Sequence, residues 1–186
     1  MTAPREAPAP RWEIDLAAPV AERLRGDGYE VFVDPDGTGY FDIAARRGEE
    51  IGLVELKLSA WRTLLRQAVA RRAYGDWVAA ALPRDRLTER IAKSSEAGPG
   101  RSIGVWLVAG GRVEVIRPAR PWPAETRASF RPCREALREL LDQRSAGLLP
   151  EGTSWTGFPA RSGRARGSRA STEWRIEEFG AAGPGR

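Results

Sequence analysis

The stretch GLVELKLS, residues 52–59, places a carboxylate and an ammonium two positions apart in an otherwise apolar run. A strand that only builds a core has no use for Glu55 and Lys57, so this side of the strand either faces water or takes part in chemistry. A second acid, Asp42, lies in the preceding strand-like run. Two acids beside a lysine suit the binding of a hard divalent cation and the stabilisation of charge on a phosphate.

The turn expected at residues 47–50 decides whether these side chains meet. If those residues form the loop of an antiparallel hairpin, Asp42 faces Glu55, with Cβ atoms about 4.5–5.5 Å apart. Side chains alternate along a strand, so Asp42, Glu55 and Lys57 share one face. The opposite face is expected to be a uniformly apolar core surface made by Phe41, Ile43, Val54, Leu56 and Leu58.

Two opposed carboxylates repel each other, and a divalent cation between them reverses the sign of that interaction. Mg²⁺ suits a site that supplies one or two carboxylates and leaves positions for water and phosphate oxygens. Such a cation lowers the pKa of a bound water and neutralises a phosphate oxygen. Lys57 would point at the same place and offset the charge of the attacked phosphate. The plain alternative is an edge hairpin whose acids and lysine are simply solvated.

The composition narrows the chemistry further. The chain has 186 residues, a net charge of +5, no histidine and one cysteine, Cys133. Without histidine there is no Ser-His-Asp or Cys-His arrangement and no histidine-ligated metal, so catalysis has to use carboxylates, lysine, tyrosine, serine or an oxygen-ligated metal. The positive charge favours an anionic partner, nucleic acid first, although a basic protein without such a partner fits the charge equally well.

Three regions are expected along the chain. Residues 1–12 are rich in Pro and Ala and are expected to be disordered, and residues 13–147 form the domain. Residues 148–186 are an Arg/Gly-rich tail, expected to be partly disordered or to pack back on the domain. No apolar run approaches about 18 residues and the N-terminus lacks a signal-like stretch, so we expect a cytoplasmic protein without a membrane segment.

Periodicity and turn chemistry indicate the elements that position the acids. Helices are expected at 15–26, 61–74, 84–93 and 134–144. Strands are expected at 29–34, 40–46, 51–58 and 76–83, with a hairpin at 102–118 that turns at Gly110-Gly111. The order predicts an α/β fold with a mixed central sheet flanked by helices, in the sequence αβββαβ.

This arrangement resembles the PD-(D/E)XK nuclease superfamily, whose members share a restriction-endonuclease-like core. The resemblance covers about residues 16–83, under half of the chain. It rests on Asp42, on the run Glu55-Leu56-Lys57, and on the helix that follows. It implies that Asp42 and Glu55 bind Mg²⁺ or Mn²⁺ together with the carbonyl of Leu56, and that Lys57 is catalytic.

Two further positions bear on the resemblance. Gln67 looks like the glutamine that some branches carry near the catalytic site, although a solvated helix residue is an equal alternative. The literal Pro-Asp pair is Pro35-Asp36, which falls in a turn and cannot pair with the second acid in the register above. Asp42 is therefore preferred, with Phe41 standing where the superfamily has proline.

Glu22, where some branches carry another acid, lies off the apolar stripe of the first helix and is expected to be solvated.

Nucleic-acid contacts are harder to place from the sequence. Trp155 and Trp174 would stack on bases or anchor the tail. The candidate phosphate contacts are Arg62, Arg66, Arg71 and Arg72 together with the Arg-rich tail.

The resemblance implies a metal-dependent DNA nuclease, with endonuclease favoured over exonuclease. It also allows a homodimer, since many such nucleases pair their sites. One alternative is a catalytically silent module of this fold that binds nucleic acid or a protein partner. Another is a basic α/β domain with an unrelated protein-interaction role, in which Asp42 and Glu55 are solvated.

Overall fold

A computed structural model describes residues 10, 12–59, 61–85, 101–150 and 153–154. Its centre is a six-stranded sheet in the order β1-β2-β3-β4-β5-β6. The strands are β1 (Glu30–Val33), β2 (Ile43–Arg47), β3 (Glu50–Leu56), β4 (Trp77–Pro83), β5 (Gly104–Ala109) and β6 (Arg112–Arg117). The helices are the 3-10 helix η1 (Glu13–Leu16), α1 (Ala17–Gly26), α2 (Trp61–Arg71), α4 (Ala124–Ser129) and α5 (Arg131–Ser145).

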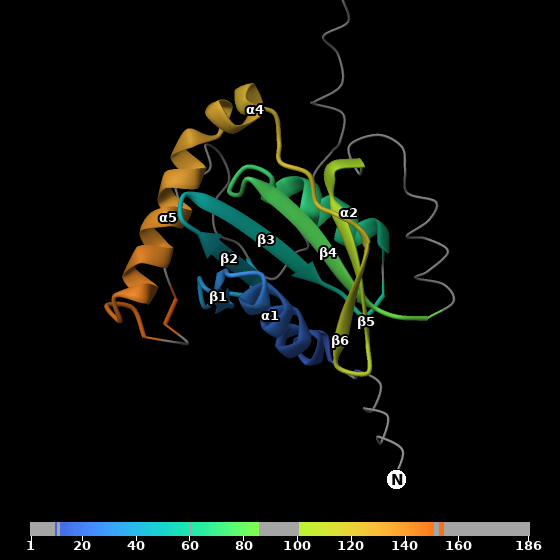
Figure 1. Cartoon of the computed structure of the whole chain (residues 1–186). Coiled ribbons are helices and arrows are strands. Elements are labelled where there is room, and N and C mark those ends of the chain that lie inside the picture. The colour runs from blue at the N-terminus through green and yellow to red at the C-terminus, as the bar shows by residue number, and fades with distance from the viewer. Residues whose placement is uncertain (1–9, 11, 60, 86–100, 151–152, 155–186) are drawn as a thin grey trace, which may run out of the picture.

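The sheet is mixed. β1, β2 and β3 form an antiparallel meander, β3, β4 and β5 are parallel, and β6 returns antiparallel to β5. The expected α/β fold, with its αβββαβ order and flanking helices, is confirmed (Figure 1). Within the described ranges, no helix combines the length and the apolar character needed to cross a bilayer.

Helices cover both faces of the sheet. On one face, α1 packs against a cluster that includes Ile43, Val54 and Leu56. On the other, α2 and α5 pack against a cluster that includes Ala44 and Leu53. Because its side chains alternate between these two cores, β3 is buried on both sides.

The expectation of one core face and one charged face is therefore wrong for β3. α2 lies over the face that carries Glu55, and Phe41, expected on the opposite face, belongs to the cluster on the α2 side. A helix covering that face removes water from it, so the charged side chain there is desolvated.

The β2–β3 hairpin has the expected register, with Ala44 paired to Leu53. Its turn is tighter than expected, because Arg47 and Glu50 still pair and only two residues remain in the loop. Gly48 takes φ = +59°, the left-handed conformation that a two-residue hairpin turn requires. The hairpin of β5 and β6 turns at Gly110-Gly111 as expected, with φ of +57° and +73°.

The other helices depart from expectation in two places. The helix expected at 84–93 lies mostly outside the described residues, and Arg84 and Asp85 are not helical. The last helix, α5, begins at Arg131 rather than at Arg134, and α4 precedes it. α4 was missed because Pro123, its N-cap residue, ends a proline-rich run that reads as extended chain.

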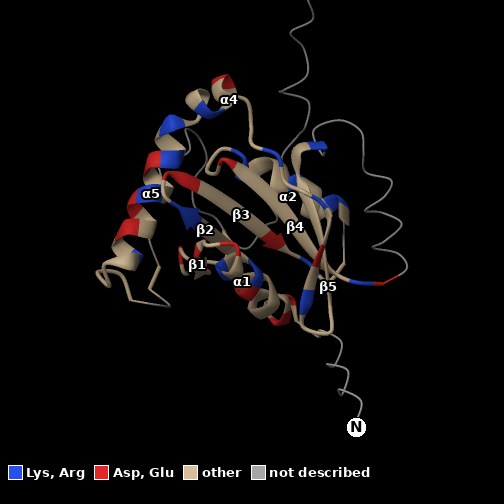
Figure 2. Ribbon diagram, viewed as in Figure 1, with Lys and Arg blue, Asp and Glu red and all other residues tan. Residues whose placement is uncertain are grey.

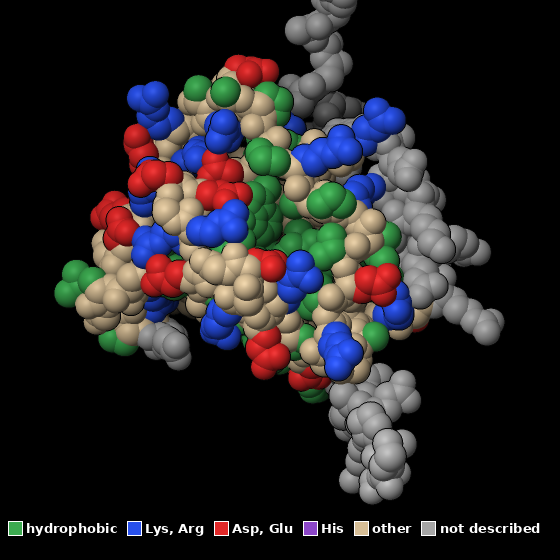
Figure 3. Space-filling view, in the orientation of Figure 1, with side chains coloured by type: hydrophobic (Ala, Val, Ile, Leu, Met, Phe, Trp, Pro, Cys, Tyr) green, Lys and Arg blue, Asp and Glu red, His purple; other side chains and the backbone are tan. Residues whose placement is uncertain are grey.

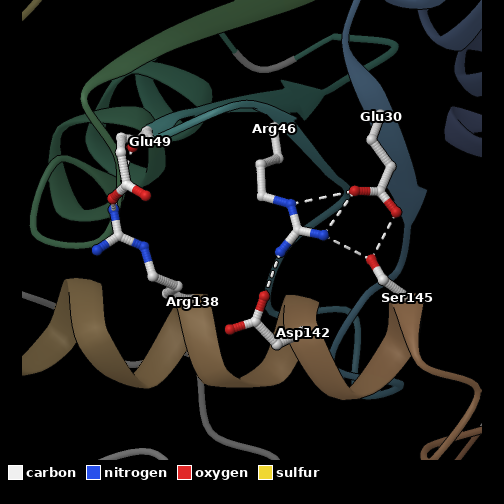
Figure 4. A network of polar contacts seen from close by, with 6 residues as sticks. All are labelled: Glu30, Arg46, Glu49, Arg138, Asp142 and Ser145. Atoms are coloured by element: carbon white, nitrogen blue, oxygen red, sulfur yellow. Dashed lines mark hydrogen bonds and ion pairs between the residues drawn. The ribbon is translucent and has the colours of Figure 1, made fainter.

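Polar contacts fasten α5 to the outer strands of the sheet (Figure 4). Arg46 on β2 contacts Glu30 on β1 at 2.6 Å and Asp142 on α5 at 2.5 Å. Ser145 donates to Glu30 at 2.5 Å, and Arg138 contacts the turn residue Glu49. This network sets where α5 lies across β1 and β2.

The described part of the tail contacts the loop that follows β1. Arg144 donates to the carbonyls of Pro35 and Thr153, at 2.8 and 2.7 Å. Gly37 lies against this segment, since a Cβ built on it would come within 2.6 Å of the Thr153 carbonyl oxygen. Most of residues 1–12 and the rest of the tail, with Trp155, Trp174 and the arginine run, lie outside the described residues.

Candidate active site at the end of strand β3

The loop between β1 and β2 places Asp42 at the end of β3. The Asp34 N–H donates to the Asp42 carbonyl at 2.9 Å, and Asp34 takes the unusual φ of +44°. The Asp42 carboxylate then accepts the Leu56 N–H at 2.7 Å. The side chain thus continues the hydrogen bonding of β3 one residue before β2 begins. In an extended strand the carbonyl of a residue lies on the same side as its N–H, so the Leu56 carbonyl also faces Asp42.

Asp36 has a different role. It is buried, and it accepts the Phe41 N–H at 3.2 Å and the Thr38 hydroxyl. These bonds hold the loop together from inside and leave Asp36 away from Glu55. The choice of Asp42 over Asp36 as the acid opposite Glu55 agrees with this placement.

Glu55 is buried, with 2% of the residue exposed. Its Oε1 accepts from Arg71 Nε on α2 at 2.7 Å, and the Arg71 guanidinium lies 3.7 Å from the centre of the Tyr40 ring. Burial raises the pKa of Glu55 to about 7, because the favourable charge of Arg71 does not offset desolvation and the negative charge of Asp42 adds to it. The reading in which Glu55 is solvated is therefore wrong.

The pKa of Asp42 is raised as well. Burial is again the main cause, and the Leu56 N–H and the charge of Lys57 act against it. The negative charge of Asp42 helps to raise the pKa of Glu55, so the two carboxylates lie near one another, as the hairpin register predicted. The described residues do not compensate this cost fully.

Lys57 lies at the same place but has a partner that the sequence did not suggest. Its Nζ contacts Glu13 Oε2 of η1 at 2.6 Å, and its N–H donates to the Ala81 carbonyl on β4 at 3.1 Å. Glu13 was missed because nothing in its local sequence marks it, and its approach depends on how η1 packs against β3 and β4. Glu22, by contrast, is exposed on α1, as expected.

Gln67 lies on α2 one helical turn before Arg71, and so on the same side of the helix. Its Oε1 is buried and has no hydrogen-bond partner among the described residues. A buried amide oxygen without a donor costs free energy, so this position suits a ligand or water that donates to it. The contact of Gln67 with such a group stays a prediction.

Of the four arginines expected here to contact phosphate, Arg72 is half-buried and the other three divide into two kinds. Arg62 and Arg66 are exposed on α2, as a solvated or phosphate-binding role requires. Arg71 is buried with only 8% of its side chain exposed, so its assignment to surface phosphate contact is wrong. Acidic and basic positions adjoin along the ribbon near the end of β3 (Figure 2), and both signs are interspersed over the face shown in Figure 3.

The residues present fit a divalent cation in part. Two carboxylates with raised pKa values, a backbone carbonyl and an unpaired amide oxygen are the hard oxygen donors that Mg²⁺ or Mn²⁺ prefers. Arg71 contacts one oxygen of Glu55, and a carboxylate has a second oxygen with lone pairs of its own. Among the described residues no three or more Asp, Glu, Cys or His side chains form a metal-binding group. The fit therefore depends on the two acids Asp42 and Glu55 and not on a larger set of charged ligands.

Comparison with known proteins adds little. No protein-family model matches the chain, and no curated protein matches it. Among solved structures it is similar to a protein of unknown function from Silicibacter pomeroyi, with 20% sequence identity and a TM-score of 0.43. That likeness covers 71% of this chain and 90% of the other.

Proposed function

We propose that this chain is a Mg²⁺- or Mn²⁺-dependent nuclease of the PD-(D/E)XK kind, with endonucleolytic cleavage of DNA favoured. The observation that carries the proposal is the carboxylate pair of buried Glu55 and half-buried Asp42, both with raised pKa values. A fold that desolvates two acids together and leaves the cost only partly compensated favours an added cation between them.

Each side chain has a distinct part in this proposal. Asp42, Glu55 and the Leu56 carbonyl would bind the cation, which supplies Lewis-acid activation of water and of a phosphate oxygen. Lys57 offsets negative charge on the attacked phosphate, and its contact with Glu13 holds the ammonium near the acids. Arg71 orients Glu55 by donating a hydrogen bond to its Oε1. The Gln67 Oε1 accepts a hydrogen bond from a water or from the substrate.

The test uses plasmid and linear DNA, with branched and single-stranded DNA for substrate choice, incubated with Mn²⁺. Asp42→Ala, Glu55→Gln and Lys57→Ala should each lower cleavage by at least about 100-fold. Glu22→Ala, which removes an exposed acid on α1, is the matched control and should cleave normally. Circular dichroism confirms that each variant is folded. Full cleavage in EDTA, or by folded Glu55→Gln, would sink the proposal.

A catalytically silent module that binds nucleic acid or protein is the second candidate. It is favoured by the two ion pairs already made in the site, Glu55 with Arg71 and Lys57 with Glu13. Calorimetric titration with Mn²⁺ separates the two candidates. Heat of Mn²⁺ binding that Asp42→Ala abolishes selects the nuclease, whereas salt-sensitive DNA binding without any metal binding selects the silent module.

A further inference from the structure

A second polar site lies at the opposite end of the sheet from Glu55. α4 and the first turns of α5 form an open pocket of about 280 Å³, and its lining includes Arg127, Arg131, Arg134 and Arg138. Figure 2 shows basic positions in α4 and in the adjoining turns of α5. The pocket adjoins the start of β4, because two of these arginines contact the buried Asp76, which directly precedes that strand.

Positive charge is in excess in this pocket. Arg127 and Arg134 share the single carboxylate of Asp76, at 3.0 and 2.7 Å. Arg131 is exposed and makes no hydrogen bond or ion pair with any described residue. The first turn of α5 carries no acid, although the dipole of a helix favours negative charge there. The dipole and the guanidiniums therefore add to the same positive potential.

Two acids near the pocket reduce this excess without removing it. Arg138 contacts Glu49, whose side chain is 90% exposed, so that ion pair is weakened by water (Figure 4). Glu135 also lines the pocket. Four guanidiniums against the three carboxylates of Asp76, Glu49 and Glu135 leave one positive charge.

Two guanidinium donors beside the pocket are unused. Arg127 Nε and Arg134 Nη1 are buried and have no hydrogen-bond partner among the described residues. A buried donor of a charged group costs free energy unless an acceptor meets it. Asp76 accepts from Nη1 of Arg127 and Nη2 of Arg134, so both guanidiniums are held in place while another donor atom of each has no partner among the described residues.

We propose that this arginine pocket binds a phosphate group. Guanidinium forks match the oxygens of phosphate, and the volume is at the low end for ligand pockets, which fits one phosphate group and not a large organic ligand. The group belongs either to a nucleic-acid backbone or to a small free phosphate compound. The inference does not rest on the nuclease proposal, because none of its residues lies in the Asp42–Glu55 site.

The experiment compares wild type, Arg131→Glu and Arg25→Glu in EDTA, which keeps divalent cations out of the candidate active site. Arg25 is exposed on α1, so the control changes net charge equally on another helix. One arm measures binding of a fluorescent 20-nucleotide single strand by anisotropy at several salt concentrations. The other measures the thermal shift caused by inorganic phosphate against chloride at equal ionic strength.

If the phosphate is part of a nucleic acid, Arg131→Glu should weaken binding of the strand about tenfold and lower the salt slope by about 0.7, with Arg25→Glu near wild type. If it is a small compound, the thermal shift by inorganic phosphate should vanish in Arg131→Glu alone, with DNA binding unchanged. Arg134→Lys, which keeps the charge opposite Asp76 but loses the fork, should show the same loss in a folded protein. Equal behaviour of Arg131→Glu and Arg25→Glu in both arms overturns the proposal.

Discussion

Glu55 in β3 and Asp76 just before the parallel strand β4 are both buried carboxylates, yet their pKa values move in opposite directions. Burial raises the pKa of Asp76, but hydrogen bonds from the Ile51 N–H, Arg127 and Arg134 outweigh it and leave the pKa below its usual value. Glu55 has one guanidinium partner in Arg71, and its pKa rises to about 7.

The difference shows how the fold separates a structural acid from a candidate functional one. Asp76 receives enough donors to stay ionised, and it joins the start of β4 to α4 and α5. Glu55 is left with an incomplete set of partners and with a second acid nearby. An acid of the first kind stabilises the protein by itself, whereas we expect an acid of the second kind to be stabilised only if a cation binds beside it.

Removing Asp76 should have the largest effect. Asp76→Ala leaves the mostly buried Arg134 and the partly exposed Arg127 without their shared, buried carboxylate, and we expect the free energy of unfolding at pH 7 to fall by about 3 kcal/mol. Urea denaturation measures it. Because the folded pKa is below the usual value of 3.8, this stabilisation is present above about pH 4 and is lost as the pH falls through the folded pKa. Asp142→Ala, which removes a carboxylate with 64% exposure, should cost less than about 1 kcal/mol. Equal costs for the two variants would contradict the comparison.

Glu55 should show the opposite pH dependence. Its folded pKa of about 7 lies above the usual 4.5, so the folded state binds the proton more tightly and wild-type stability declines as the pH rises between these values. Glu55→Gln keeps an acceptor for Arg71 but cannot ionise. Relative to wild type it should therefore gain about 3 kcal/mol of unfolding free energy between pH 4 and pH 8. Parallel stability curves for the two proteins would refute this, and Glu22→Gln provides the control.

A divalent cation should reduce the contrast between the two acids. Mn²⁺ at about 100 times its dissociation constant should stabilise the folded protein by about 2.7 kcal/mol at pH 8. The gain should be smaller at pH 6, because Glu55 must lose its proton before it binds the cation. Thermal unfolding with NaCl at equal ionic strength as the reference measures this. An undiminished gain in Asp42→Ala would place the cation elsewhere.

The smallest effect is expected at Glu13. Its contact with Lys57 is partly exposed, so Glu13→Gln should change the unfolding free energy by less than about 1 kcal/mol. The charge of Glu13 raises the pKa of Asp42, which should therefore decrease in the variant. Titration of the Asp42 carboxyl by NMR would detect this, and an unchanged pKa would show that Glu13 does not act on the site.

The sequence was sufficient for the features that local rules control. The expected turn and the alternation of side chains predicted the register of β2 against β3, and with it the approach of Asp42 to Glu55. Glycines that can take positive φ marked the turn between β5 and β6 in the same way. The family resemblance and the catalytic roles stay predictions.

Features that depend on the packing of separate elements were not predictable in this way. Whether Arg71 faces Glu55 or solvent depends on the rotation of α2 about its axis, which a helical pattern alone leaves open. The ligands of Asp76 come from positions 51, 127 and 134, which have no common local signal. The sequence also could not show that α2 covers the face of β3 that carries Glu55. The amphipathic pattern of α2 predicts a helix that packs on the sheet, but it does not say which part of the sheet the helix covers.

The contacts of Arg144 and Thr153 with the loop around Gly37 bear on the order in which parts of the protein fold during synthesis. The loop that places Asp42 is held by residues made more than a hundred positions later. During translation, the hairpin that carries both acids can pair long before Arg144 and Thr153 have left the ribosome. We therefore expect the geometry of Asp42 to mature last, so that a stalled nascent chain holds the acids without their final alignment.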